Sequence, residues 1–429
     1  MASPLERLFA LEQFGIKLGL DNIRAILAAL GHPERAYRSI HIAGTNGKGS
    51  VAAMVERGLR AAGLKTGRYT SPHLDRIEER VALDGQSVDR ATFESVTAAV
   101  FEVIDGSLSR RPEFRPTFFE VSTAVGFEIF KRADVDVAVV EVGLGGRFDA
   151  TNVLTPTITA ITTIAFDHER HLGNTLDQIA FEKAGIAKPG VPLVVGHLSR
   201  EAAARISQVA REVQAPVFDA HAPTTDRKYP PLNLALKGRH QLDNAAVAVA
   251  ILERWSTLVN HVSTEAIVTG LTDCEWPARL EWLRIPAAGP GGELLLDAAH
   301  NPAGAAALAS YLRDTGSTKL PVVFAAMADK DLKSMIEALT PVASSFIATT
   351  VPNARARPAD QLADEIRSIA PLIPVEAIAS PDDAVIRAFE LVAHRDPVEG
   401  GPRRAVACGS IYMVGPLRAR LFASGATRI

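Results

Sequence analysis

A glycine-rich loop that joins a predicted strand to a predicted helix constrains this chain more than any other feature. Residues 39–43 favour a short strand and residues 50–62 favour a helix, and residues 44–50 between them read Gly-Thr-Asn-Gly-Lys-Gly-Ser. A loop that enters a helix in this way directs backbone N–H groups and the positive helix end towards a polyphosphate. Its glycines allow close backbone approach, and Lys48 adds a mobile positive charge. The pattern therefore predicts a nucleotide-phosphate site.

The match to the usual phosphate loop is imperfect. The pattern GxxxxGK[ST] requires glycine at position 42, where this chain has Ile42, and Gly49 separates Lys48 from Ser50. A plain strand–helix junction is therefore an alternative. Polar residues that follow other predicted strands favour the nucleotide site over this alternative.

Length and composition narrow the class of protein. A chain of 429 residues is too long for one ordinary core, so two domains are expected. The net charge of −3 argues against nucleic-acid and membrane-surface partners, which require a basic face. The two cysteines, Cys274 and Cys408, lie far apart and suit a reducing cytosol. Since we find neither a secretory signal pattern nor an apolar run of ~18 residues, we expect a cytoplasmic protein.

Alternating strand and helix patterns predict two α/β domains. The β-branched runs at 135–142 and 157–165 are typical of strands buried on both faces of a parallel sheet. The glycine- and proline-rich stretch at 285–292 is the best linker, so we predict domains over residues 1–284 and 293–429. The second domain contains five apolar strand patterns, each followed by a helical pattern: 293–297, 321–327, 345–350, 373–378 and 404–408.

Polar side chains follow three predicted strands of the first domain at their carboxyl ends, where parallel sheets collect ligands. Ser71 follows the strand at 67–70, Glu141 closes 135–142, and Asp167 and His168 come just past 157–165. Mg²⁺ beside a nucleotide requires such oxygen ligands, because it neutralises the β and γ phosphate oxygens. A turn serine, a strand-end carboxylate near a helix dipole and a loop histidine are the ordinary alternatives. Their coincidence with the phosphate loop favours a metal site.

Arg147 and Lys183 are weaker candidates in the first domain. Arg147 lies in a glycine-rich loop at 142–149 and could seat an anionic substrate or a developing phosphoryl charge, with a surface arginine as the alternative. Glu182 and Lys183 are adjacent on a predicted helix, and a surface Glu–Lys pair is the ordinary interpretation.

Near and beyond the predicted linker, the sequence offers further candidates. Asp297 and His300 follow the strand at 293–297, from which they could reach across a cleft between the domains. Asn244 and Arg279 lie near the domain junction, where an arginine can stack on or hydrogen-bond to a base. Asp331 follows the next strand, and capping of its helix is the ordinary alternative.

Together these residues resemble one family closely, the folylpolyglutamate synthase/dihydrofolate synthase branch of the Mur ligases. The resemblance spans nearly the whole chain in order. Its blocks are 44–50 (GTNGKGS), 70–74 (TSPHL), 79–80 (ER), 119–130 (FEVSTAVGFEIF), 141–152 (EVGLGGRFDATN), 167–168 (DH), 172–173 (LG), 182–186 (EKAGI), 240–241 (HQ), 244–246 (NAA), 296–302 (LDAAHNP), 329–331 (DKD) and 409–412 (GSIY).

The resemblance implies an α/β fold in which an N-terminal P-loop ATPase domain of the Mur-ligase type, with a parallel sheet, precedes a smaller Rossmann-like domain. It implies that ATP phosphorylates a substrate carboxylate, and that the amine of L-glutamate then attacks the acyl phosphate. The carboxylate would belong to dihydropteroate or to the terminal glutamate of a reduced folate. The expected partners are these small molecules, without nucleic acid or membrane, and a monomer is expected.

The resemblance also implies roles for individual residues. The residues expected to bind ATP are Thr45, Asn46, Gly47, Lys48, Gly49, Ser50, Asn244, Arg279 and Asp297. The residues expected to hold two Mg²⁺ ions are Ser71, Glu141, His168 and a carbamylated Lys183. K⁺ is a further expected ion. The catalytic residues would be Lys48, Lys183, Asp297 and His300. The pterin substrate would contact Leu18, Thr117, Phe118, Phe119, Glu120, Arg147, Phe148 and Asp149.

The chain departs from the family pattern in two places. Ala298 stands where many members have glycine, which affects local packing. Lys17 occupies a position that is an acidic pterin contact in some dual-activity members, and this argues against dihydropteroate as a substrate. In contrast, residues 147–150 resemble the dual-activity version of their loop. We therefore expect a bifunctional enzyme.

Three alternatives remain open. The protein could be a folylpolyglutamate synthase only, another Mur-type ligase that acts on a cell-wall nucleotide precursor, or a P-loop protein that binds nucleotide as a switch. Residues 117–120 weigh against the cell-wall ligase. The carboxylates and histidines at several strand ends weigh against the switch.

Overall fold

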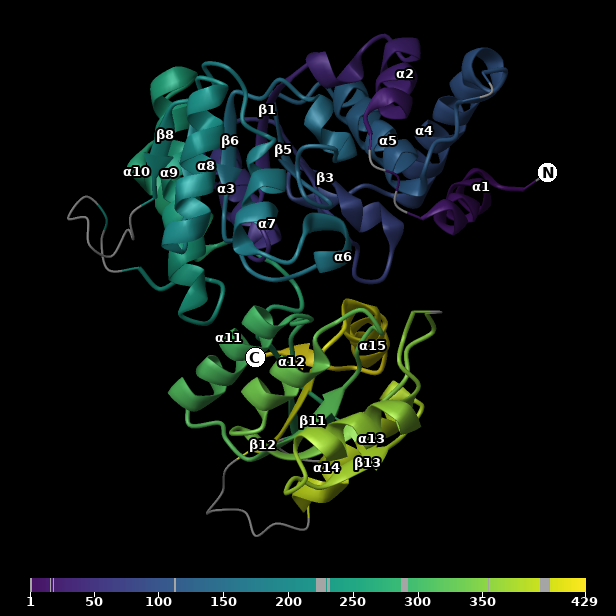
Figure 1. The fold of residues 1–429 in the computed structure, drawn as a ribbon, viewed down its shortest axis with the longest axis vertical. Helices are drawn as coiled ribbons and strands as arrows, with labels where there is room; N and C mark the ends of the chain where they lie inside the picture. Colours follow the sequence, from purple (N-terminus) through teal and green to yellow (C-terminus); the bar gives the residue numbers. More distant parts are fainter. Residues whose placement is uncertain are drawn as a thin grey trace. The chain divides into compact units, whose positions relative to one another are not determined.

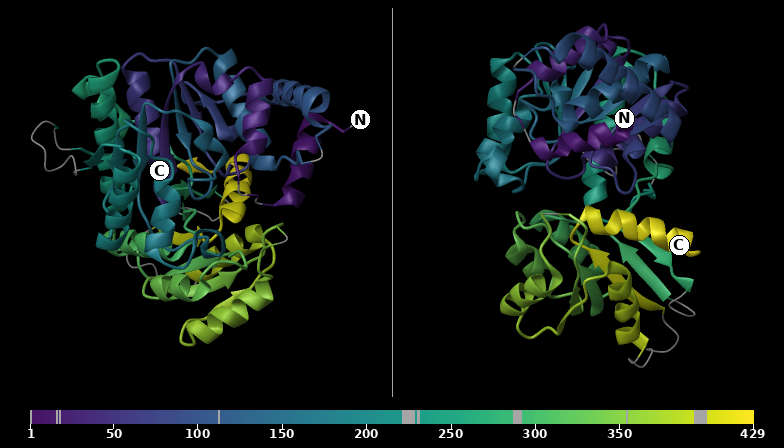
Figure 2. Two further views of the ribbon diagram at one scale, coloured as in Figure 1. Left: turned by 45° about the horizontal axis from the view of Figure 1, so that its top comes forward. Right: turned by 90° about the vertical axis from the view of Figure 1, so that its right-hand side faces the viewer.

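The computed structural model describes residues 2–429 except 16, 18, 112, 221–228, 230, 231, 287–291, 354 and 394–401. Contacts between Cα atoms divide the chain into two units. Unit 1 comprises Met1–Ala165, Glu169–Ala235 and Gln241–Glu275, and unit 2 comprises Phe166–His168, Leu236–His240 and Trp276–Ile429. Each unit is a sheet with helices packed against it, as Figures 1 and 2 show. The two α/β domains expected from the sequence are thus confirmed in fold class.

The sheet of unit 1 has eight strands in the order β4-β3-β2-β5-β1-β6-β7-β8. The strands from β2 to β8 in this order pair in parallel, whereas β3 and β4 are antiparallel additions at one edge. The strand bounds are β1 (Arg38–Ala43), β2 (Thr66–Tyr69), β3 (Val81–Leu83), β4 (Gln86–Ser87), β5 (Val137–Glu141), β6 (Ile158–Ile161), β7 (Leu193–Val195) and β8 (Val217–Asp219). The two central strands, β5 and β1, are buried almost throughout, as their β-branched runs predict.

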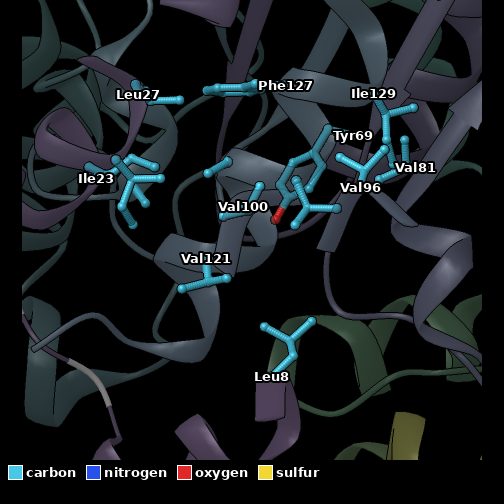
Figure 3. Packing of buried hydrophobic residues seen from close by; sticks show 14 of the residues in the cluster. Leu8, Ile23, Leu27, Tyr69, Val81, Val96, Val100, Val121, Phe127 and Ile129 are labelled. Carbon is cyan, nitrogen blue, oxygen red and sulfur yellow. The ribbon is translucent and has the colours of Figure 1, made fainter. Parts of the chain in front are cut away.

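Two hydrophobic clusters among the described residues join helices of unit 1 to this sheet. In one, Tyr69 of β2 packs among Val96, Val100 and Phe127, and Figure 3 shows this packing. The other joins β1, β6 and β7 to α7 and α8. The helices are α1 (Pro4–Ala10), η1 (Leu11–Phe14), α2 (Asp21–Ala29), η2 (Pro33–Arg35), α3 (Lys48–Ala61), η3 (Ile77–Arg80), α4 (Arg90–Val103), η4 (Ile104–Leu108), α5 (Phe118–Arg132), η5 (Ala150–Val153), α6 (Glu169–Leu172), α7 (Leu176–Ala184), α8 (Arg200–Glu212), α9 (His240–Leu258) and α10 (Thr264–Thr272).

The sheet of unit 2 has seven strands in the order β13-β12-β11-β14-β10-β9-β15. The five strand patterns predicted from the sequence are all present and parallel, as β10 (Gly292–Leu296), β11 (Leu320–Phe324), β12 (Ala343–Ala348), β13 (Val375–Ala377) and β14 (Arg403–Cys408). The helices that follow them are α11 (Pro302–Asp314), α12 (Leu332–Leu339), α13 (Ala359–Ile369), α14 (Pro381–Ala393) and α15 (Ile411–Ala423). Two antiparallel strands, β9 (Glu281–Arg284) and β15 (Thr427–Arg428), extend the sheet beyond the prediction.

The boundaries predicted from the sequence differ from the division into units. The long segment of unit 2 starts at Trp276, because β9 pairs with β10 and so belongs to the second sheet, and two short earlier segments also belong to this unit. Most of the predicted linker at 285–292 lies outside the described residues, so the linker stays a prediction. Among the described residues, no helix combines the length and the apolar character that a membrane span needs.

Candidate active site

The loop between β1 and α3 requires glycine at two positions. Gly44 has φ +150° and Gly47, the N-cap of α3, has φ +85°. A Cβ atom at Gly44 would collide with the Thr162 hydroxyl, and one at Gly47 would collide with the side-chain oxygen of Asn244. The backbone can therefore adopt this path only without side chains at these positions. This backbone path places the N-terminal end of α3, a helix of 14 residues, close to the end of the buried strand β1. A phosphate site requires a helix end in such a position.

Two threonines that follow β6 brace the loop. The hydroxyls of Thr162 and Thr163 donate to the carbonyl oxygen of Asn46, at 2.6 and 3.1 Å. The N–H of Asn46 donates to the Thr163 hydroxyl at 3.0 Å, and the N–H of Thr45 donates to the Thr163 carbonyl at 2.8 Å. The loop is therefore held in shape by the neighbouring strand end.

Lys48 lies across the same loop. Its side-chain nitrogen donates to the carbonyl oxygens of Gly44 and Thr45, both at 3.2 Å, and lies 3.8 Å from an oxygen of Glu141. The mobile cation predicted from the sequence is thus placed between the loop and the end of β5. A polyphosphate bound to the loop would give this ammonium stronger acceptors than the two carbonyls.

Glu141 and Ser71 meet because β5 lies between β1 and β2 in the sheet. Glu141 is buried, and its second carboxylate oxygen accepts a hydrogen bond of 3.3 Å from the Ser71 N–H. A carboxylate beside a serine near a phosphate loop fits Mg²⁺, which prefers oxygen ligands and usually keeps phosphates and waters as the remainder. Among the described residues, no group of three or more His, Cys, Asp or Glu side chains is arranged to hold a metal on its own.

Lys183 is buried and touches the phosphate loop. Its side-chain nitrogen donates a hydrogen bond of 2.8 Å to the carbonyl oxygen of Gly44. The interpretation of Glu182 and Lys183 as a surface pair is therefore wrong. The helix α7 turns Lys183 inward because its neighbours Ile179, Ala180 and Ala184 form the buried face.

Glu182 pairs with Arg147 instead. The guanidinium of Arg147 donates to both carboxylate oxygens of Glu182, at 2.6 and 3.3 Å, and the Arg147 N–H donates to the Glu182 carbonyl at 2.8 Å. The same guanidinium lies over the rings of Phe148 and Phe181, at 4.4 and 4.8 Å from their centroids. Arg147 is thus an organised side chain rather than a loose surface arginine.

Asp149 organises its own loop. Its carboxylate accepts hydrogen bonds from the N–H groups of Leu144 and Thr151, at 2.8 and 3.0 Å, and from the Thr151 hydroxyl. Burial raises the pKa of this carboxyl above its ordinary value, although these hydrogen bonds oppose the shift. The carboxylate therefore shapes the loop that presents Arg147 and Phe148.

Four of the residues predicted to contact a pterin, at positions 117–120, lie at the start of α5. Thr117 and Glu120 form a capping box, in which the Glu120 N–H donates to the Thr117 hydroxyl at 3.2 Å and the Thr117 N–H donates to the Glu120 carboxylate at 2.7 Å. The ring of Phe118 stacks on that of Phe9, with 5.9 Å between the ring centroids, and the guanidinium of Arg80 lies 5.0 Å from the Phe118 centroid.

Phe119 and Leu18 are further predicted pterin contacts. Phe119 fills the space beside Gly143, where a Cβ atom would collide with its ring. Leu18 lies outside the described residues, and Lys17 is exposed.

Asn244 reaches the phosphate loop through a chain of buried amides. Its side-chain nitrogen donates to the Gln241 side-chain oxygen at 2.8 Å, and Gln241 in turn donates to the Ser50 hydroxyl at 3.4 Å. Both α9 residues thus lie beside residues 47–50 of the loop.

In unit 2, Asp297 uses both carboxylate oxygens to hold backbone. One oxygen accepts from the Leu280 N–H and the other from the Ala299 N–H, both at 2.8 Å. Burial raises the pKa of the Asp297 carboxyl above its usual range, while Arg279 opposes the shift. The adjacent Arg279 donates to the Ala278 carbonyl at 3.2 Å.

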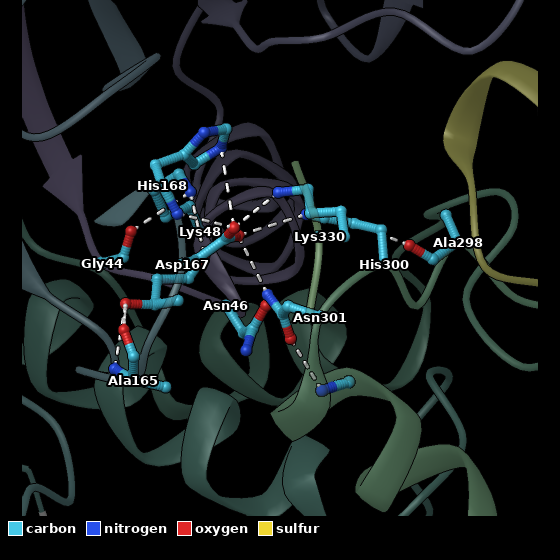
Figure 4. A network of polar contacts seen from close by, with 12 residues as sticks. Gly44, Asn46, Lys48, Ala165, Asp167, His168, Ala298, His300, Asn301 and Lys330 are labelled. Atoms are coloured by element: carbon cyan, nitrogen blue, oxygen red, sulfur yellow. Dashed lines mark hydrogen bonds and ion pairs between the residues drawn. The ribbon is translucent and has the colours of Figure 1, made fainter. Parts of the chain in front are cut away.

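Asp167 is the centre of a polar network in unit 2, shown in Figure 4. It pairs with Lys330, accepts from the Asn301 amide at 3.1 Å, and lies 3.5 Å from His300 and 3.9 Å from His168. Although burial opposes its ionisation, these partners hold the pKa of the Asp167 carboxyl far below its usual range. His168 and His300 are therefore brought together by one carboxylate.

The sequence placed Asp167 at a strand end, but it did not predict the contact between Asp167 and Lys330 or the hydrogen bonds of Thr162 and Thr163. Asp167 and Lys330 lie within family blocks, but 163 positions separate them and only the fold brings them together. The two threonines carried a usable signal, since hydroxyl residues that end a central strand lie at the ligand edge of a sheet. Asp331 caps α12 by accepting from the Ser334 N–H at 3.1 Å, so the ordinary interpretation of that residue is confirmed.

Comparison with known proteins gives consistent matches. Residues 278–398 match the family model "Mur ligase, glutamate ligase domain". The chain is 33% identical over 431 residues to the dihydrofolate synthase/folylpolyglutamate synthase of Bacillus subtilis, covering 95% of this chain and 96% of the relative. It is 32% identical to the folylpolyglutamate synthase of Mycobacterium tuberculosis solved with ADP and AMPPCP, with a TM-score of 0.87 over 97% of this chain and 98% of that one.

A solved bifunctional folylpolyglutamate synthase/dihydrofolate synthase with Mn, AMPPNP and L-glutamate bound is 29% identical, with a TM-score of 0.82 over 98% of both chains. The resemblance read from the sequence blocks is thereby confirmed over nearly the full length. This chain belongs to the folylpolyglutamate synthase/dihydrofolate synthase family of Mur ligases.

Proposed function

We propose that this protein is an ATP-dependent ligase that joins L-glutamate to reduced folates and to dihydropteroate. The observation that carries the proposal is the braced phosphate loop with Lys48, Ser71 and Glu141 at one sheet edge. It occurs in a chain that matches a dihydrofolate synthase/folylpolyglutamate synthase over 95% of its length. The relative named for both activities supports the bifunctional form of the proposal.

The reaction requires two displacements. A substrate carboxylate oxygen attacks the γ phosphorus of ATP, and ADP leaves with the electrons of the broken P–O bond. The amine of glutamate then attacks the acyl carbon, phosphate leaves, and the nitrogen loses a proton as the amide forms. In this scheme the N–H groups of residues 45–50 and the ammonium of Lys48 hold and orient the triphosphate.

Glu141, Ser71 and His168 would hold divalent metal, with Mg²⁺ as the proposed ion and K⁺ as an additional one. When bound, Mg²⁺ neutralises phosphate oxygens and so lowers the cost of charge that develops in both displacements. Asn244 and Arg279 would contact the nucleotide. Asp297 and His300 would contribute from unit 2, where Asp297 keeps the backbone of both Leu280 and Ala299 in place.

Lys183 is proposed to act as a carbamate. The ammonium would first lose a proton, and its amine nitrogen would then bond to the carbon of CO₂ and lose a second proton. The two losses change a cation into an anion beside the carbonyl of Gly44. Burial supports this step, since desolvation favours the neutral amine that reacts. The product carboxylate would supply an oxygen ligand for a second metal.

The pterin would lie among residues of α5 and the Arg147 loop. Phe148 is 38% exposed while its neighbour Arg147 is held by Glu182, so the ring offers an accessible stacking surface on a fixed support. Lys17 argues against dihydropteroate, and residues 147–150 argue for it. Both substrates therefore belong in the first experiment.

That experiment measures phosphate release from ATP that depends on glutamate, with dihydropteroate and tetrahydrofolate tested separately. Release with both substrates is the expected result. Release with tetrahydrofolate only would restrict the protein to folylpolyglutamate synthesis and direct attention to Lys17. If neither substrate gives phosphate release and a UDP-linked cell-wall precursor does, the proposal would be overturned in favour of another Mur-type ligase. Slow ATP turnover that no acceptor accelerates would favour a nucleotide switch.

The protein is further proposed to be a monomer of the cytoplasm. Light scattering coupled to size exclusion tests the first part, with a mass near 45.8 kDa as the expected result. Fractionation of cells that produce the protein tests the second part.

A further inference from the structure

We propose that Glu281 is a positioning residue for the turn that carries Arg279, and that Arg428, the next-to-last residue of the chain, takes part through this carboxylate. The inference rests on the proposed function in one respect, namely that Arg279 contacts the nucleotide. All of its structural evidence lies within unit 2.

The turn has an unfavourable backbone on both sides of Arg279. Ala278 has φ +56° and Leu280 has φ +48°, although neither residue is glycine. Residues with a Cβ atom rarely adopt this left-handed region, because the Cβ crowds the following carbonyl oxygen. Two such residues in one turn persist only where the surroundings hold them.

Two buried carboxylates hold this turn, one on each side. The Ala278 N–H donates to Glu281 at 2.9 Å, and the Leu280 N–H donates to Asp297 at 2.8 Å. In addition, the Ala278 carbonyl accepts from the Ala298 N–H at 3.0 Å. The position of Arg279 therefore depends on the positions of the Glu281 and Asp297 carboxylates.

Glu281 stays in place because two arginines bind it. Arg418 of α15 donates from Nε and Nη2 to the two carboxylate oxygens, at 2.7 and 3.0 Å, and Arg428 of β15 donates from Nε at 2.6 Å. Burial opposes ionisation of the Glu281 carboxyl, but the bonds from Arg418, Ala278 and Arg428 outweigh burial and hold its pKa below the ordinary value. The carboxylate is thus charged, buried and bonded on both oxygens.

The last strand brings Arg428 to this carboxylate. β15 pairs antiparallel with β9, with Thr427 opposite Arg284 and Arg428 opposite Leu283. The Ile429 N–H donates to the Trp282 carbonyl at 3.2 Å, which fastens the end of the chain to the same strand. Glu281 is the first residue of β9. Its side chain therefore connects Arg428 of β15 to the turn that carries Arg279.

A purely structural role for this cluster predicts a different outcome from a positioning role. Loss of fold stability would lower the amount of active enzyme and leave the Michaelis constants unchanged. Loss of the Arg279 position would raise the KM for ATP and leave the KM for glutamate unchanged. The ratio of the two constants therefore separates the two roles.

The test compares Arg428→Ala with Arg420→Ala in the full chain. Arg420 lies on α15, the helix that also carries Arg418, but Arg420 pairs with Asp382 at the surface instead of with Glu281. We expect Arg428→Ala to raise the KM for ATP about five- to tenfold, as the loss of one charged hydrogen bond would do, with no change in the KM for glutamate. Arg420→Ala is expected to match the wild-type protein.

Glu281→Gln provides the second variant. The amide keeps the shape and one acceptor oxygen but loses the charge that two arginines bind, so the KM for ATP should rise again while calorimetric ATP binding weakens by a similar factor. Arg428→Lys retains the cation without the planar donor and should fall between wild type and Arg428→Ala. It replaces Arg428→Ala as the measurement if that variant does not fold.

An unchanged KM for ATP in folded Arg428 and Glu281 variants, beside an active wild-type enzyme, would overturn the inference and leave the proposed function intact. A wild-type protein that neither binds nor turns over ATP would instead contradict the proposed function. Equal rises in the KM for ATP and for glutamate would also overturn the positioning role.

Discussion

The side-chain nitrogen of Lys183 lies 2.8 Å from the carbonyl oxygen of Gly44, so a buried residue of α7 touches the first glycine of the phosphate loop. α7 and the loop are 139 positions apart in sequence, and the sheet brings them together. A carbamate formed on this amine would place a negative charge where the ammonium now donates. A metal bound by that carbamate would connect α7 to nucleotide binding.

Lys183→Ala should lose ligase activity by at least about a hundredfold, since it removes a group that would stabilise charge in the transition state. Short carboxylic acids such as acetate should restore part of the activity by replacing the carbamate oxygens. Phosphate release with and without acetate measures this, with chloride at equal ionic strength as the control. Carbon-13 spectroscopy of wild-type protein in labelled bicarbonate should show a carbamate signal that the variant lacks. Its absence from active wild-type protein would contradict the carbamate.

Lys48→Ala should abolish ligation and leave the fold intact. The ammonium of Lys48 bridges the loop carbonyls and Glu141, where it can neutralise a bound phosphate. We expect a loss of at least about a hundredfold in kcat/KM for ATP, with an unchanged circular dichroism spectrum. Lys333→Ala on the exposed face of α12 is the control. Full activity of the Lys48 variant would exclude the phosphate-loop assignment.

A comparison of Gly47→Ala with Gly63→Ala distinguishes the cost of a left-handed backbone from the cost of a steric collision of the new Cβ atom. The two glycines have nearly equal φ values, +85° and +86°, but a Cβ atom at Gly63 would meet nothing within 4 Å while one at Gly47 would collide with Asn244. Each variant should lose about 1 kcal/mol of unfolding free energy from the left-handed backbone. Gly47→Ala should lose more, and its ATP affinity should fall at least about tenfold because the loop must shift.

Urea unfolding and calorimetric ATP titration measure the two effects. Gly63→Ala should bind ATP as the wild-type protein does. Equal stability and equal ATP affinity in the two variants would show that the space beside Asn244 is adaptable and that Gly47 is needed for backbone freedom alone.

Much of the fold follows from local pattern. The phosphate loop, the buried run that forms β5 and the five parallel strands of unit 2 were all predictable, because each depends on neighbours in sequence. β9 and β15 were not, since a two-residue strand such as Thr427–Arg428 has no periodicity and is defined only by its partner. The antiparallel edge of the sheet in unit 2 therefore had to come from the structure.

Some residues of the candidate site were likewise predictable from the sequence, and others were not. Lys48, Ser71 and Glu141 were predictable because strand ends of one parallel sheet share an edge. The pair of Arg147 and Glu182 was not, because it depends on how a glycine-rich loop packs against the end of α7. The same holds for Thr162 and the loop carbonyl of Asn46, whose hydrogen bond depends on the path of two separate segments. Roles that depend on long-range contacts thus exceed what the sequence pattern can predict.

His41 is a buried histidine whose protonation makes the stability of the fold depend on pH. It is fully buried on β1, and its Nε2 lies 2.8 Å from the Thr151 hydroxyl, which donates to Asp149. The histidine must therefore donate from Nε2, and its Nδ1 finds no hydrogen-bond partner among the described residues. Burial first, and Lys188 second, lower the pKa of His41 from 6.5 to about 3. The ring stays neutral in the folded protein.

Stability should therefore fall as the pH falls below the pKa of His41 in the unfolded chain. Between pH 6.5 and about 3 the unfolded chain binds a proton at His41 that the folded protein does not, so this residue lowers the free energy of unfolding by about 1.4 kcal/mol for each pH unit. His41→Gln keeps a donor for Thr151 and removes the titration. Urea unfolding at pH 7 and pH 5 should show a loss about 2 kcal/mol smaller in this variant than in the wild type. His261→Gln, at an exposed position, should show the wild-type loss. Equal losses in all three proteins would mean that His41 is protonated in the folded state as readily as in the unfolded chain.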